Sequence, residues 1–169
     1  CLELIEAMYL FDLSIKEMDI LIHPEALAHS VIEYNDYTSI INYFFPDMKI
    51  PIINFFNTLS KNKYPKIIKY DFKKNVNLNF FDIDKKKFPI FSLFKKMNFH
   101  SPHDSIKFNL SNQFVVELFK NNKINYIDIP KLIEKMISIE LNASLNSIGS
   151  IINYENEFNK IIYEKFSQI

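Results

Sequence analysis

A single glycine, Gly149, stands among the 169 residues of this chain. Glycine is the residue that lets a backbone take positive φ or approach a bound phosphate closely. The glycine-rich turns of dinucleotide-binding folds and of P-loops each need two or more glycines within a few residues. A complete nucleotide site of either type is therefore excluded within this sequence.

Charge and cysteine content exclude further classes. Twenty acidic residues balance twenty basic residues, all of them Lys, so no global charge favours a nucleic-acid or membrane-surface partner. Cys1 is the one cysteine in the sequence, which excludes a disulfide framework or a thiolate zinc cluster and fits a reducing compartment. No apolar run reaches the roughly 18–20 residues of a transmembrane helix. We therefore expect a soluble, cytoplasmic protein.

The start of the sequence predicts a fragment. Cys1 is not preceded by Met, and the pattern of Leu2, Ile5, Met8 and Tyr9 already has helical spacing. We therefore expect a longer protein upstream. An N-terminal Cys also occurs in lipid-anchored bacterial proteins, but these usually continue through a polar tether, whereas a helical pattern follows here at once.

The charges divide the chain into three zones. Residues 1–50 carry nine acids and two Lys, residues 61–96 carry three acids and eleven Lys, and residues 97–169 carry eight acids and seven Lys. The middle zone has weak periodicity, so we predict a Lys-rich linker with short extended pieces around Asn75–Phe81. Aromatic residues interleave with its lysines, which leaves nucleic-acid binding as an alternative to a solvated linker.

Local patterns predict an α+β fold. The first zone predicts a helix over residues 1–11, a capping box at Ser14–Glu17, a buried strand at Met18–Pro24, an antiparallel hairpin over Ser30–Phe44 and a helix after Pro51. The third zone predicts helices at Phe88–Met97, Ser105–Lys120, Pro130–Ile137 and Ile151–Phe166. The predicted organisation is the end of an α/β catalytic domain (1–59), a linker (60–87) and a C-terminal antiparallel helical bundle (88–169).

Several titratable residues could carry chemistry. Glu3 and Glu6 lie about one turn apart on one helix face and could bind a divalent metal, although a solvated helix face is the commoner explanation of this spacing. His23 and His29 flank Pro24 near strand ends, where either a site or a structural role is possible. His100, His103 and Asp104 resemble a metal trio, although helix capping accounts for Asp104 or Ser105.

The order of five motifs resembles a known family. CLELIEAMYLF, LIHPEALAHSVIEYND, PDMKIPI, DIDKKKFPIF and LSNQF follow one another at the spacing of the last portion of 1-deoxy-D-xylulose 5-phosphate reductoisomerases. The resemblance implies an oxidoreductase that converts this sugar phosphate to 2-C-methyl-D-erythritol 4-phosphate in isoprenoid precursor synthesis. It implies NADPH and a divalent metal (Mg²⁺, Mn²⁺ or Co²⁺) as cofactors.

The resemblance also implies roles for individual residues. Glu3 matches a metal-binding carboxylate that faces the substrate, and Glu6 matches a Glu that supports it. His29 matches a His near the site, and Pro46 and Met48 match the segment beside the nicotinamide. The family forms homodimers through the sheet region, which corresponds to the Ser30–Phe44 hairpin.

The resemblance has limits that bear on activity. The family's NADPH-binding domain and its other metal carboxylates precede the position of Cys1, so we expect the chain alone to be inactive. Cys1, Tyr37 and Phe44 stand where the family has Gly, and Lys49 stands where it has Arg. A different class of function, a non-catalytic helical interaction module with a basic linker, is the alternative.

Overall fold

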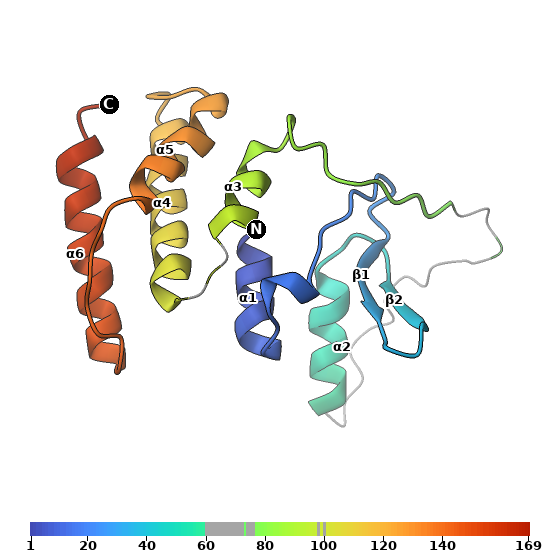
Figure 1. The fold of residues 1–169 in the computed structure, drawn as a ribbon. Helices are drawn as coiled ribbons and strands as arrows, with labels where there is room; N and C mark the ends of the chain where they lie inside the picture. Colours follow the sequence, from blue (N-terminus) through green and yellow to red (C-terminus); the bar gives the residue numbers. More distant parts are fainter. Residues whose placement is uncertain (60–72, 74–76, 98, 100) are drawn as a thin grey trace. The chain divides into compact units, whose positions relative to one another are not determined.

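The computed structural model describes residues 1–59, 73, 77–97, 99 and 101–169 (Figure 1). Among them lie six α-helices and one two-stranded antiparallel sheet, so the predicted α+β class is confirmed. The chain forms two compact units. The first combines Cys1–Asp19 with Asp84–Ile169, and the second is Ile20–Ile83. The predicted boundaries at 59/60 and 87/88 stay a prediction.

The first unit is helical. Its helices are α1 (Leu2–Phe11), α3 (Pro89–Met97), α4 (Pro102–Lys120), α5 (Ile129–Ile137) and α6 (Ile148–Phe166). Short 3₁₀ turns lie at Ile15–Glu17 and Tyr126–Asp128. The predicted helices are confirmed, and so is the capping box, in which Ser14 N–H and Oγ donate to Glu17 Oε2 at 2.8 and 2.7 Å.

Two of these helices begin three residues earlier than predicted. Ser101 is the N-cap of α4, with its Oγ accepting from the backbone N–H of His103, and Pro102 occupies the first turn. Ser147 caps α6 in the same way and accepts from the backbone N–H of Ser150. A capping oxygen satisfies a backbone donor that the first turn leaves without an intrahelical partner, and this adds a turn ahead of the apolar pattern.

The core of the first unit is apolar and tightly enclosed. α4 packs against both α5 and α6. α1 joins this unit through Leu4, which is buried, and through Tyr9, whose hydroxyl lies 3.2 Å from Ser105 Oγ. The antiparallel order predicted for the bundle stays a prediction. The side chains at most 1% exposed are Phe94, Phe108, Ser111, Val115, Ile133, Met136, Tyr154, Phe158 and Ile162.

The second unit contains the predicted hairpin and a helix. β1 (Ala28–Glu33) pairs antiparallel with β2 (Ser39–Tyr43), and the register shifts between Ala28 and Ser30, which places His29 at a β-bulge. α2 (Lys49–Leu59) follows and begins before Pro51. It can do so because Asp47 Oδ1 accepts from Lys49 N–H at 2.9 Å.

The strand predicted at Met18–Pro24 is wrong. Only Ile22 pairs there, in an isolated antiparallel bridge to Phe81 with N–H to carbonyl distances of 2.8 and 2.9 Å. Pro24 has no N–H to extend the ladder. Of the extended pieces predicted around Asn75–Phe81, residues 75 and 76 lie outside the described residues, and 77–80 have no regular secondary structure.

In the part of the chain that the structure describes, none of the helices combines the length and apolarity needed to cross a membrane. Most of the predicted Lys-rich linker (60–87), namely residues 60–72 and 74–76, lies outside the described residues.

The hairpin closes around a residue with positive φ. Tyr37 has φ 66°, and its side chain is 99% exposed. Tyr34 N–H donates to Thr38 O at 2.9 Å, and Asp36 Oδ1 accepts from Thr38 N–H and Oγ at 3.0 and 2.7 Å. The turn is therefore closed despite the Cβ at position 37.

We expect Tyr37→Gly to stabilise the hairpin. Relief of a left-handed residue with a Cβ is worth about 1–2 kcal/mol, and the greater unfolded freedom of Gly offsets about 0.5–1 kcal/mol of it. The net gain of about 0.5–1 kcal/mol should raise the hydrogen-exchange protection of the Tyr34 amide about two- to five-fold. Tyr37→Phe keeps the strained backbone and should leave the protection unchanged. Lower protection in the Gly variant would show that the tyrosine side chain stabilises the turn.

Candidate functional site

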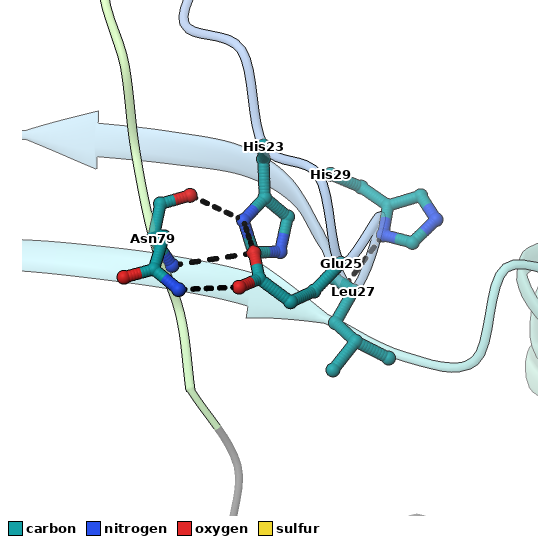
Figure 2. Close-up of polar contacts among 5 residues, drawn as sticks. All are labelled: His23, Glu25, Leu27, His29 and Asn79. Atoms are coloured by element: carbon teal, nitrogen blue, oxygen red, sulfur yellow. Dashed lines mark hydrogen bonds and ion pairs between the residues drawn. The ribbon is translucent and has the colours of Figure 1, made fainter.

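The His29 side chain is held by one carbonyl and one aromatic ring. His29 Nδ1 lies 2.8 Å from Leu27 O (Figure 2). A carbonyl oxygen can only accept, so Nδ1 carries the proton and donates. The ring also stacks on Phe44, with centroids 3.8 Å apart and planes at 18°. Neutral His29 therefore has its lone pair on Nε2, and because the residue is exposed, that atom can accept a hydrogen bond from a ligand.

The Leu27 carbonyl is shared. It also accepts from Phe44 N–H at 3.1 Å, so the imidazole and the ring it stacks on are tied to the same oxygen. The β-bulge places the His29 side chain at the start of β1, and bulges re-aim a side chain relative to the sheet. The local backbone therefore holds in place both groups that the His29 ring contacts, the Leu27 carbonyl and the Phe44 ring.

A second cluster joins the chain segments around positions 23–25 and 79. Asn79 Nδ2 donates to Glu25 Oε1 at 2.5 Å, and Asn79 N–H donates to Glu25 Oε2 at 3.3 Å. His23 Nδ1 lies 2.8 Å from Asn79 O and 3.0 Å from Glu25 Oε2, so it also carries a proton (Figure 2). We call His23, Glu25 and Asn79 the clamp. The Asn79 side chain, by donating to the carboxylate, lowers the pKa of Glu25 below its usual value.

The surroundings of His23 are those of a histidine that stabilises the fold. Its side chain is 7% exposed and stacks on Phe80, with centroids 4.8 Å apart. Its Nε2 is buried and has no hydrogen-bond partner among the described residues. Between His23 and His29 the chain turns through Ala26, which has φ 52° and donates its N–H to His23 O at 3.0 Å.

Pro46 and Met48 lie in the same unit as His29. Both are exposed, Met48 at 68%, and they stand two and four residues after Phe44, the ring on which His29 stacks. Asp47 N–H donates to Phe45 O at 2.6 Å, and Asp47 O accepts from Ile50 N–H at 3.0 Å. These bonds fix the tight turn that carries Pro46 and Met48 into α2.

Glu3 and Glu6 lie on α1, in the other unit. Both are exposed, and buried Leu4 between them anchors the helix. Exposed carboxylate oxygens one turn apart fit a divalent cation, which prefers oxygen ligands. Within the described ranges, no three His, Cys, Asp or Glu side chains gather into a group that could hold a metal. The roles of Glu3, Glu6, His29, Pro46 and Met48 stay predictions.

The structure accounts for His103 without a metal. Its Nε2 lies 2.7 Å from Ala143 O and donates to it, and its Nδ1 accepts from Ser101 Oγ at 2.6 Å. Both ring nitrogens are thus used, and no lone pair is left for a cation. The cap of this helix is Ser101, and not Asp104 or Ser105 as predicted. His100 lies outside the described residues.

Sequence reasoning missed Glu25 and Asn79. They stand 54 positions apart, so no local periodicity links them. The one sequence signal nearby is the His-Pro-Glu run, which could have suggested a short ion pair between His23 and Glu25.

The comparisons with known proteins agree with this arrangement of motifs. Residues 45–161 match the family described as DXP reductoisomerase C-terminal domain. The chain belongs to this family. Among its relatives, 1-deoxy-D-xylulose 5-phosphate reductoisomerase of Vesicomyosocius okutanii is 32% identical over 99% of the chain, and that of Clostridium tetani is 34% identical over 98%. The chain spans 43% of the length of each of these two relatives.

Solved structures of DXP reductoisomerases share the fold. The enzyme from Zymomonas mobilis in complex with NADPH has a TM-score of 0.82 and 28% identity, covering 94% of this chain and 42% of that one. A DOX-P reductoisomerase in complex with magnesium has a TM-score of 0.77 and 27% identity, covering 98% of this chain and 44% of that one. The resemblance found from the five motifs is therefore confirmed at the level of the family.

The lowered pKa of Glu25 predicts how the clamp responds to acid. A carboxyl whose folded pKa is depressed stabilises the fold above its unfolded pKa, and this contribution is lost as the pH falls through the folded value. We expect the Glu25 carboxyl carbon, followed by NMR, to titrate below its ordinary value of 4.5. Asn79→Ala removes the largest cause and should raise that midpoint toward 4.5, whereas Asn77→Ala on the same segment should not. A wild-type midpoint at or above 4.5 would contradict the hydrogen-bonded geometry.

Proposed function

We propose that this chain forms the end of the catalytic domain and the C-terminal domain of a 1-deoxy-D-xylulose 5-phosphate reductoisomerase. The enzyme would convert this sugar phosphate to 2-C-methyl-D-erythritol 4-phosphate with NADPH and a divalent metal, in isoprenoid precursor synthesis in the cytoplasm. The observation that carries the proposal is the family match, together with relatives of that name aligned over 99% and 98% of the chain. The alternative, a non-catalytic helical interaction module with a basic linker, is not favoured by that match.

Glu3 is the residue that we assign to the metal. A divalent cation bound there would polarise substrate oxygens and stabilise negative charge that develops on them. Glu3 is exposed on α1, so its carboxylate is available as a hard oxygen ligand, and Glu6 one turn along would support it from outside the metal's coordination shell. The cation would need further ligands from elsewhere in a longer protein.

His29, Pro46 and Met48 are the residues that we assign to the substrate and the cofactor. The exposed Nε2 of His29 can accept a hydrogen bond from a substrate hydroxyl, because Nδ1 is occupied by Leu27 O. Met48 presents an exposed apolar side chain, which suits contact with the flat face of a nicotinamide ring. Pro46 fixes the turn that presents it. Solved relatives in complex with NADPH and with magnesium support these two cofactors for the longer enzyme.

The proposed metal role predicts the effect of Glu3→Gln. Because the chain spans 43% of the Clostridium tetani relative, we would test a chimera in which this chain replaces the matching part of that enzyme. Glu3→Gln keeps the side-chain shape but removes the charge that binds the cation. We expect metal-dependent NADPH oxidation to fall about 100-fold, with partial recovery at higher Mg²⁺ or Mn²⁺.

The controls for this experiment separate chemistry from folding. Glu134→Gln removes an exposed carboxylate from α5 and should keep wild-type kinetics. The 169-residue chain alone, without the part of the chimera that comes from the Clostridium tetani enzyme, should show no NADPH oxidation. Unchanged turnover and unchanged metal affinity in the Glu3→Gln chimera would return Glu3 to the role of a solvated helix residue.

We also propose a homodimer formed through the hairpin. Val31 pairs with Ile41 and Ile32 pairs with Ile40, so each face of the ladder carries one apolar cross-strand pair. All four side chains are exposed, and a two-stranded sheet has open edges on both sides. Proteins usually pair or cover such edges and apolar surfaces, and a second copy of the sheet would do so.

The dimer predicts different effects for neighbouring residues. Ile40 is 54% exposed and Ile41 is 40% exposed, and they point to opposite faces. We expect Ile40→Asp to weaken association, measured by sedimentation of the chimera, and Ile41→Asp to lower its melting temperature more than its association. A wild-type chimera that stays monomeric at tens of micromolar would contradict the proposal, because an interface of about 1,600 Å² should associate at that concentration.

A further inference from the structure

The turn that precedes β1 is strained and yet carries the contact that orients His29. Ala26 has φ 52°, a conformation that costs about 1–2 kcal/mol for a residue with a Cβ. Leu27, the next residue, supplies the carbonyl oxygen that accepts from His29 Nδ1. A strained backbone persists only where its surroundings hold it.

The clamp is what holds this turn. Ala26 donates its N–H to His23 O, and His23 and Glu25 on either side of Pro24 are both bonded to Asn79. Asn79 uses three groups for this: its side-chain amide and its N–H donate to Glu25, and its carbonyl accepts from His23. The two hydrogen bonds between Ile22 and Phe81 keep the two segments in register beside the clamp.

We propose that Asn79 is a positioning residue that holds the His29 ring with Nδ1 protonated and Nε2 free to accept a hydrogen bond. Figure 2 shows two sets of contacts, those among Asn79, Glu25 and His23 and the one between His29 Nδ1 and Leu27 O, which the backbone of residues 23–27 joins. The side chain of Asn79 does not contact His29, so its effect passes through the backbone of residues 23–27. This inference rests on the proposed function only for the assignment of His29 to substrate binding.

The first test reads the His29 ring directly and needs no catalysis. ¹⁵N NMR of the imidazole in the 169-residue chain distinguishes the Nδ1–H from the Nε2–H tautomer. We expect Nδ1–H to dominate in the wild type and both tautomers to appear in Asn79→Ala. Asn77→Ala, an Asn-to-Ala change on the same segment, should leave His29 as in the wild type. An unchanged tautomer in Asn79→Ala would overturn the inference.

A second variant covers the case in which Asn79→Ala unfolds the second unit. Glu25→Gln keeps an acceptor for the Asn79 amide but removes the carboxylate oxygen that Asn79 N–H and His23 Nδ1 share, so it should change the His29 tautomer in the same direction as Asn79→Ala. The two variants remove different hydrogen bonds of the clamp, so the double variant should perturb His29 more than either alone. An unchanged tautomer in Glu25→Gln would also overturn the proposed route.

The chimera links the clamp to the reaction. We expect Asn79→Ala to lower kcat about ten-fold or more and to shift the pH profile, with little change in KM for NADPH. A change in melting temperature without a change in the pH profile would mean a structural role only and would contradict the inference. Failure of the Glu3→Gln prediction together with an altered His29 tautomer in Asn79→Ala would count against the proposed function and leave the clamp standing.

Discussion

Positive backbone φ at residues that carry a Cβ is the constraint around which this structure is arranged. The one glycine lies inside α6 and does not have positive φ, so turns that need it fall to other residues. Two of them, Asp12 after α1 and Asn122 after α4, belong to the types that tolerate this conformation, since their short polar side chains bond locally. Among the described residues, the others are Ala26, Tyr37 and Phe99.

Each of these less tolerant positions must be stabilised by its neighbours. An ordinary domain has a net stability of only about 5–15 kcal/mol, so strain of about 1–2 kcal/mol at a turn matters. At Tyr37 the Asp36 carboxylate and the ladder hydrogen bonds close the turn locally. At Ala26 the stabilising groups come from residue 79, far along the sequence. Of these two turns, the one near the candidate site therefore depends on a contact between residues 54 positions apart.

Prediction from the sequence succeeded where the signal was local. Apolar spacing located α1 and α3–α6, the Ser14–Glu17 capping box was correct, and two β-rich runs around Asn35–Thr38 gave the hairpin. It failed at Met18–Pro24 because a short apolar run looks like a strand whether or not a second strand exists to pair with it. Helix starts were misplaced where Ser101 and Ser147 extended a helix beyond its apolar stripe.

For the candidate site, too, the sequence predicted what has a local signal and missed what depends on the fold. The motif order identified the family and pointed to Glu3 and His29, but spacing alone did not separate Glu3 from a solvated helix face. Nor could it show how two histidines in one loop differ. Both donate through Nδ1, His29 to Leu27 O and His23 to Asn79 O and Glu25 Oε2.

Accessibility of the other ring nitrogen separates the two histidines. Nε2 of His23 is enclosed, whereas His29 is exposed at a bulge and can meet a ligand. Between them the chain turns at Ala26, which has φ 52°, while Phe80 and Asn79 enclose His23. A costly positive φ at a residue with a Cβ therefore stands between a histidine that is held by Asn79 and Glu25 and a histidine whose Nε2 is open to a ligand.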